Sequence, residues 1–238
     1  MDSSFNLDPA RLQIFKRDLT DENRLIAEAI RAIMPANPGG VILDVGAGMG
    51  DIAAAAFPDR KTVLLDLLEF PDNGVAQHRR HTGSFWDFKK DRHKIDVMIL
   101  SHVLQYIDDD IPKLIERIDD LNPKNIVIVS NKATMFDIHV KKWLEYQNIS
   151  SNPEYIISPC PLSKFKKSKE LNISSEIYCS DFFQLASVLS EIIYDAKMPV
   201  HTVRQFADWI EKKLTFPRVA IPQTVTLLSR ETLHEQER

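Results

Sequence analysis

Cysteine is scarce in this chain of 238 residues, which carries only Cys160 and Cys179. Two distant cysteines provide neither a disulfide framework nor the paired spacing of a zinc site, so we interpret both as ordinary thiols and expect no metal. Long apolar runs are also lacking: no stretch of roughly eighteen apolar residues occurs, and the opening MDSSFNLD does not resemble a signal peptide. The sequence therefore predicts a cytoplasmic protein without membrane contact.

Excess positive charge is lacking as well. The chain has 30 Lys and Arg against 34 Asp and Glu, which gives a formal net charge of -4. Nucleic acids are usually bound through clustered cations, so nucleic acid is an unfavoured partner. The length and the 44% hydrophobic share suit one α/β domain over 1–238, as a monomer or homodimer.

The first half of the chain alternates short apolar runs with helical patterns. Apolar residues at helical spacing mark helices at 22–34 and 112–121. The runs expected to form buried strands are 41–45, 62–65, 95–100 and 126–129. This alternation predicts an α/β fold with a mostly parallel sheet and helices on both faces.

The pattern changes after Ser130, where irregular stretches become longer. Two helical patterns, 181–193 and 202–214, and a late strand at 225–228 follow. The basic run KFKKSK at 164–169 could receive an anionic substrate or RNA, but we expect a solvated loop there.

The strongest chemical signal is VILDVGAGMG at 41–50, a strand that enters a G-x-G-x-G turn before a helix-compatible segment. Glycines permit a sharp turn and close ligand approach at the carboxyl end of a parallel strand. A nicotinamide-binding turn would have a third glycine where Asp51 stands, and this carboxylate would repel a pyrophosphate. Asp44 and Asp51 favour a cationic cofactor instead, although a tight turn without ligand is the alternative.

The stretch VILDVGAGMGDI resembles the first motif of class I S-adenosylmethionine-dependent methyltransferases, and the resemblance extends over about 22–130. It implies a Rossmann-like, seven-stranded sheet and S-adenosylmethionine as methyl donor, with S-adenosylhomocysteine as product. The turn residues that it assigns to the cofactor are Asp44, Gly46, Ala47, Gly48 and Gly50.

The resemblance also assigns residues after the second and third strands. VLLD ends in Asp66, where the family has an acidic ribose ligand; Leu67 follows it, and Glu69 is the alternative ligand. In GSFWDF, Ser84 stands where an aspartate often binds the adenine amine. Phe85 or Trp86 would pack on the purine, unless these rings belong to the core.

The stretch IDVMILSHVLQY is similar to the family segment beside the methionine half of the cofactor, and it offers Ser101, His102 and Leu104. A neutral His102 could take a proton from the methyl acceptor near pH 7, or it could line the pocket without proton chemistry. NPPY and DPPY, typical of base-flipping DNA and glutamine amide methyltransferases, are absent.

We divide the domain into an N-terminal helical cap element at 1–34, a cofactor-binding half at 35–130, a substrate-cap insertion at 131–200 and a C-terminal helix and strand at 201–238. Candidate acceptor contacts are Phe5, Phe15, Tyr106, Phe136, His139, Trp143 and Tyr146, although apolar side chains at such spacing are more often packing residues. The sequence thus predicts methyl transfer to oxygen or nitrogen of a small-molecule metabolite. The alternatives are an RNA or protein methyltransferase and a catalytically silent S-adenosylmethionine-binding protein.

Overall fold

The computed structural model describes residues 14–35, 38–70, 77–89, 94–104, 111–151, 162 and 164–230. These residues divide into two compact units. The helical unit lies within 1–22, 131–156 and 174–222, and the sheet unit lies within 23–130, 157–173 and 223–238.

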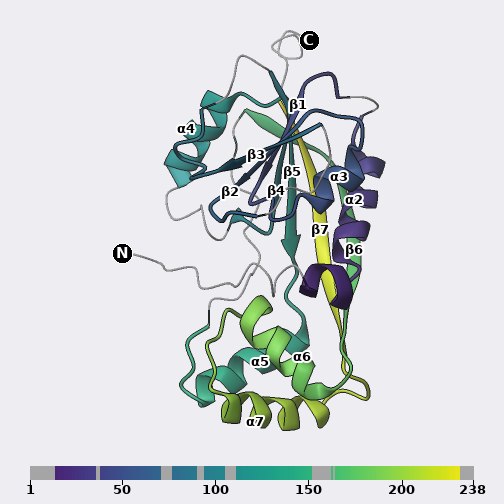
Figure 1. Cartoon of the computed structure of the whole chain (residues 1–238), viewed down its shortest axis with the longest axis vertical. Coiled ribbons are helices and arrows are strands. Elements are labelled where there is room, and N and C mark those ends of the chain that lie inside the picture. Colours follow the sequence, from purple (N-terminus) through teal and green to yellow (C-terminus); the bar gives the residue numbers. More distant parts are fainter. Residues whose placement is uncertain are drawn as a thin grey trace. The chain divides into compact units, whose positions relative to one another are not determined.

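Seven strands in the described part of the chain form one sheet in the order β3-β2-β1-β4-β5-β7-β6 (Figure 1). Their bounds are β1 Val41–Val45, β2 Thr62–Asp66, β3 His78–Thr82, β4 Ile95–Ser101, β5 Asn125–Asn131, β6 Phe165–Tyr178 and β7 Arg218–Arg230. Neighbours among β1 to β5 pair in parallel. Strand β7 runs antiparallel to β5, because Arg230 N donates to Lys124 O at 3.0 Å and Lys132 N donates to Pro222 O at 2.8 Å. The predicted Rossmann-like, mostly parallel seven-stranded sheet is confirmed.

Helices cover both faces of this sheet. The helical bounds are η1 Phe15–Leu19, α2 Glu22–Ile33, α3 Asp51–Ala56, α4 Ile111–Leu121, α5 Met135–Tyr146, α6 Phe182–Val188, η3 Leu189–Ile193 and α7 Val200–Glu211. Leu43 of β1 belongs to the core cluster that contains Leu114 of α4, whereas its neighbour Ile42 belongs to the cluster that contains Ile30 of α2. Successive side chains of a strand point to opposite faces, so both faces of β1 are buried, and this explains its continuous apolar run.

The expected loop at 164–169 was wrong, since Phe165 begins the long strand β6. Its pairing with β7 appears in side-chain contacts that follow an antiparallel register: Thr226 Oγ1 donates to Glu170 at 3.4 Å and Ser168 Oγ donates to Leu227 O at 3.2 Å. Strand β6 lies at the end of the strand order, and exposed lysines are typical of edge strands. A polar edge strand has little apolar periodicity, so the local sequence resembled a loop.

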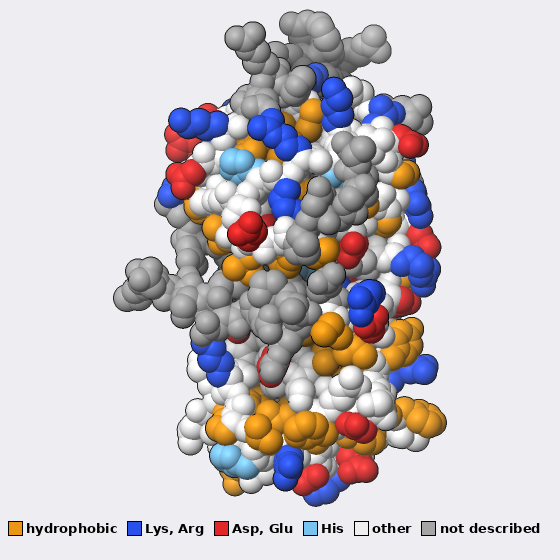
Figure 2. Space-filling view, in the orientation of Figure 1, with side chains coloured by type: hydrophobic (Ala, Val, Ile, Leu, Met, Phe, Trp, Pro, Cys, Tyr) orange, Lys and Arg blue, Asp and Glu red, His pale blue; other side chains and the backbone are white. Residues whose placement is uncertain are grey.

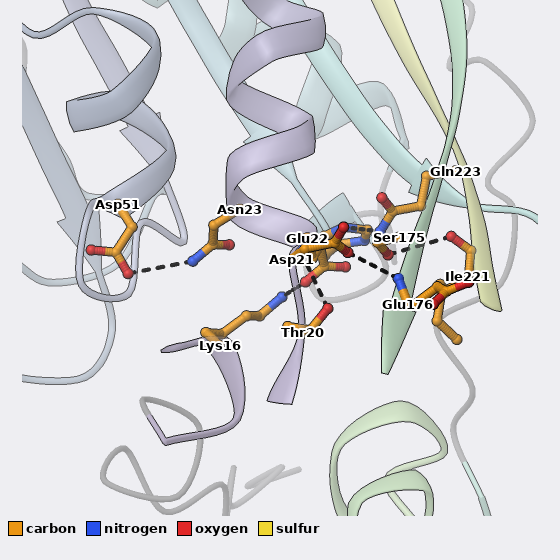
Figure 3. A network of polar contacts seen from close by, with 11 residues as sticks. Lys16, Thr20, Asp21, Glu22, Asn23, Asp51, Ser175, Glu176, Ile221 and Gln223 are labelled. Carbon is orange, nitrogen blue, oxygen red and sulfur yellow. Dashed lines mark hydrogen bonds and ion pairs between the residues drawn. The ribbon is translucent and has the colours of Figure 1, made fainter. Parts of the chain in front are cut away.

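The helical unit has its own core, formed by α5, α6, η3 and α7 with Phe15 of η1. Thr134 and Asp137 form a capping box at the start of α5. The second oxygen of the buried Asp137 accepts a hydrogen bond of 2.6 Å from the hydroxyl of Tyr194, which is 1% exposed. The segment before α2 joins this unit, because Asp21 accepts a hydrogen bond of 3.0 Å from Glu176 N (Figure 3).

Replacing Tyr194 with phenylalanine should lower the free energy of unfolding by about 1–3 kcal/mol, because a buried carboxylate oxygen of Asp137 loses its donor. Urea unfolding followed by circular dichroism measures the loss. Tyr146→Phe is the matched control, since Tyr146 on α5 is 83% exposed and should change stability by less than about 0.5 kcal/mol. Equal midpoints for the two variants would contradict a stabilising role of this hydrogen bond.

Candidate functional site

The glycine-rich turn after β1 depends on left-handed backbone conformations. Gly46, Gly48 and Gly50 have φ angles of 68°, 53° and 83°, a region that favours glycine. A Cβ at Gly46 would come within 2.8 Å of Val103, whereas a Cβ at Gly48 would meet no described atom within 4 Å. Contact with Val103 therefore leaves no room for a side chain at Gly46, while Gly48 borders space that a ligand could use.

Strand β2 holds this turn through the backbone carbonyl of Leu65 and the side chain of Asp66. Leu65 O accepts hydrogen bonds from Gly46 N at 2.8 Å and Ala47 N at 3.1 Å. The carboxylate of Asp66 accepts one hydrogen bond from Gly48 N at 2.8 Å and another from Leu68 N at 2.9 Å. Each carboxylate oxygen has two lone pairs, so Asp66 retains capacity for further donors.

Asp44 lies beneath the turn on β1 and is 2% exposed. Burial, together with the negative charge of Asp66, raises the pKa of Asp44 to about 8, against the opposing effect of the Arg80 guanidinium. Burial therefore favours the neutral, protonated form of Asp44.

Arg80 of β3 is a site residue that sequence reasoning missed. Its Nη1 donates to Gly48 O at 2.7 Å and its Nη2 donates to Met49 O at 3.2 Å. Strand β3 reads HRRHT and has no apolar run, so no signal in the sequence indicated that it would pair with β2.

The other predicted residues near the turn are more exposed. Leu67 directly follows Asp66 and is 65% exposed, and Glu69 is exposed too. Asp51 is exposed in the first turn of α3 and accepts a hydrogen bond of 3.3 Å from Asn23 Nδ2 (Figure 3). Leu67 thus presents apolar surface beside the predicted ribose ligand.

The structure distinguishes the two rings of the predicted adenine segment. Phe85 is 5% exposed within the sheet-unit core, whereas Trp86 is only partly buried. Arg117 of α4 donates to Phe85 O at 3.0 Å and also to Phe88 O. Ser84 Oγ accepts a hydrogen bond of 3.2 Å from Trp86 N, so this hydroxyl stabilises its own turn.

The carboxyl end of β4 combines an unsatisfied hydroxyl with an unusual backbone. Ser101 Oγ is buried and has no hydrogen-bond partner within the described ranges. His102 has a φ of 53°, a strained value for a non-glycine residue that is often found at functional sites. Its Nε2 lies 3.2 Å from Nε2 of Gln223 on β7, which is fully buried. Leu104 is 5% exposed and joins the core.

Most predicted acceptor contacts pack within the helical unit. Trp143 stacks on Phe206 with ring centroids 4.8 Å apart, and the Phe136 ring lies 6.4 Å from that of Trp209. Phe15 is 3% exposed in the same core, whereas His139 is exposed. The predicted residues Phe5 and Tyr106, and also Cys160, lie outside the described residues.

The site is assembled by parallel pairing. Val45, the last residue of β1, pairs with Leu65 of β2 and Leu100 of β4. The glycine-rich turn, Asp66 and the Ser101–His102 pair therefore leave the sheet at the same edge, where open α/β sheets bind ligands. Open space at Gly48 and a buried hydroxyl at Ser101 suit a bound small molecule with polar groups.

The family described as a methyltransferase domain matches residues 17–159. No curated protein matches the chain. A candidate methyltransferase from Bacillus halodurans C-125 is 13% identical, with a TM-score of 0.57 over 87% of this chain and 99% of its own. A candidate type II methyltransferase from Anaeromyxobacter dehalogenans is 14% identical, with a TM-score of 0.54 over 87% of this chain and 95% of its own. At these identities the structural likeness shows the fold.

The chain belongs to this methyltransferase family, because the match covers more than half of its length. It is a class I S-adenosylmethionine-dependent methyltransferase, with S-adenosylmethionine as its cofactor.

The raised pKa of Asp44 predicts that stability falls with rising pH. The folded state keeps a proton that the unfolded chain releases above its ordinary pKa of 3.8, so the loss extends from about pH 4 to about 8. Asp44→Asn cannot ionise and should remove a slope of up to about 1.4 kcal/mol per pH unit. Urea unfolding at pH 5, 6, 7 and 8 measures this slope, with Asp51→Asn as an exposed control. Parallel pH curves for wild type and Asp44→Asn would contradict the prediction.

Proposed function

We propose that this methyltransferase transfers a methyl group to an oxygen or nitrogen of a small-molecule metabolite. The carrying observation is that two of the four lysines in the basic run at 164–169 pair with acidic side chains. Lys164 pairs with Asp119 at 2.7 Å, and Lys167 pairs with Glu170 at 3.2 Å. These lysines therefore offer little net attraction to a nucleic acid, which is usually bound through unneutralised cations.

The surface supports the same proposal. Figure 2 shows acidic and basic side chains interspersed on the visible face, and the whole chain has a formal net charge of -4. On this face, interspersed charges of both signs give no extended positive field for a phosphate backbone. Among the described residues, no helix is both long and apolar enough to span a membrane.

For the cofactor, we propose that Gly46, Ala47, Gly48 and Gly50 form the floor of the site together with the buried Asp44. Asp66 would hold the ribose through its remaining lone pairs, and exposed Leu67 would cover the adenine together with Trp86 and the Ser84–Phe85 backbone. The hydroxyl of Ser101 would form a hydrogen bond with the methionine half of the cofactor. When bound, S-adenosylmethionine supplies a methyl group already activated by the sulfonium, so the protein has to align the acceptor and exclude water.

His102 is the residue that we propose to assist the acceptor. The amide nitrogen of the buried Gln223 lies 3.2 Å from its Nε2, and an amide N–H donates only to an unprotonated ring nitrogen, so this contact favours a neutral imidazole. A neutral imidazole at that position can accept the proton of a hydroxyl or an ammonium group. For the acceptor itself, Phe15, Tyr106, Phe136, His139 and Trp143 stay proposed contacts.

Methyl-labelled S-adenosylmethionine incubated with separate metabolite, RNA and protein pools should transfer its label to the metabolite pool. Gly48→Ala should lose most of this activity, because alanine in the left-handed region costs about 1–2 kcal/mol and its methyl group enters the cofactor space. Gly39→Ala is the matched control, since a Cβ there also meets no described atom within 4 Å. Label in RNA or protein would refute the small-molecule proposal, and binding without transfer would indicate a silent cofactor-binding protein.

His102→Ala should lower the rate of methyl transfer about a hundredfold, as expected for one acid–base group, while S-adenosylhomocysteine affinity stays nearly constant. A rise of the wild-type rate with pH that is lost in the variant would assign the proton transfer to this side chain. Initial rates from pH 5 to 9 test both expectations, with His201→Ala as a control for an exposed histidine. Full activity of His102→Ala with an unchanged pH profile would leave this residue a structural role.

A further inference from the structure

Arg80 makes an unusual contact with the glycine-rich turn. Its side chain extends from β3 past the intervening strand β2 to reach the carbonyl oxygens of Gly48 and Met49, at 2.7 and 3.2 Å. These two residues lie between the left-handed Gly46 and the start of α3. Arg80 thus contacts the part of the turn that borders the open space at Gly48.

The turn needs such a partner because of its backbone geometry. Carbonyl groups in an irregular turn have no regular helical or strand partners, and a partly buried carbonyl that loses its donor is costly. On the opposite side, the N–H of Gly48 is held by Asp66 at 2.8 Å. Both backbone polar groups of Gly48 therefore have side-chain partners. Its N–H donates to the Asp66 carboxylate, and its carbonyl oxygen accepts from the Arg80 guanidinium.

Charge gives Arg80 a second link to the site. Its guanidinium opposes the rise in the pKa of Asp44 that burial and Asp66 cause. Arg80 is thus a cation that interacts electrostatically with the Asp44 carboxyl group, while its planar fork donates to two carbonyl groups. A lysine could supply the charge but not this two-pronged geometry.

We infer that Arg80 is a positioning residue for the methyl donor: it holds the Gly48–Met49 segment in the conformation that binds the cofactor. This inference rests on the proposed assignment of the turn as the cofactor site. Arg80 acts through the backbone carbonyls, so its removal weakens cofactor binding more than it weakens the fold. Both functions of the side chain, the fork and the charge, contribute to this affinity.

Isothermal titration of S-adenosylhomocysteine into the full-length protein tests the inference. Arg80→Ala should raise the dissociation constant roughly 10- to 100-fold, as expected for the loss of charge-assisted hydrogen bonds. Arg80→Lys should recover only part of the affinity. Arg79→Ala is the matched control from the adjacent position of β3, where Arg79 is exposed, and it should bind like wild type.

Chemical rescue separates positioning from general destabilisation. Ethylguanidinium added to Arg80→Ala should restore part of the affinity, because it reproduces the fork, whereas ethylammonium at the same concentration should not. Melting temperatures report the fold of every variant. If Arg80→Ala melts early, Arg80→Lys decides the question, since it retains the charge and most of the packing.

Wild-type affinity in Arg80→Ala or in Arg80→Lys, or equal rescue by both cations, would overturn the inference. Failure of the underlying site assignment gives a different result. In that case Gly48→Ala would also bind S-adenosylhomocysteine like wild type, whereas failure of the Arg80 inference alone leaves the Gly48→Ala defect in place.

Discussion

Every part of the candidate site depends on the parallel pairing of β1 with β2 on one side and with β4 on the other. This pairing places the ends of three strands at one edge, so that Val45, Leu65 and Leu100 lie in register. The groups that follow them then form one site although they are far apart in the sequence. An antiparallel partner would have placed its carboxyl end at the opposite edge of the sheet.

Two carboxyl groups, those of Asp44 and Asp66, lie near each other at this edge of the sheet. Asp44 is buried near Asp66, and two carboxylates at close range cannot both ionise without cost. The protein limits this cost by keeping a proton on Asp44 at neutral pH and by placing Arg80 beside the turn. A cofactor with a sulfonium cation is electrostatically compatible with such a site, whereas a pyrophosphate would meet additional negative charge.

The aromatic side chains of the helical unit form a packed cluster. The aromatic residues after Ser130 that the sequence offered as candidate acceptor contacts pack against other aromatic rings, as Trp143 stacks on Phe206. Exposed apolar side chains also occur in the helical unit, for example Met135, which is 67% exposed, and Val200, which is 63% exposed. Helical spacing alone does not separate a packing stripe from a substrate-binding surface, because both need apolar side chains on one face.

The sequence by itself determined the buried parallel strands, the helices α2 and α4, and the glycine-rich turn, because apolar periodicity and left-handed glycines are local signals. The resemblance to the methyltransferase family, rather than a local signal, pointed to Asp66 and His102. Tertiary structure alone decided the polar edge strand β6, the bond between Arg80 and the turn, and the contact of His102 with Gln223. These features join residues from different strands, and the physical reason is general: pairing and burial depend on neighbours that only the folded chain brings together.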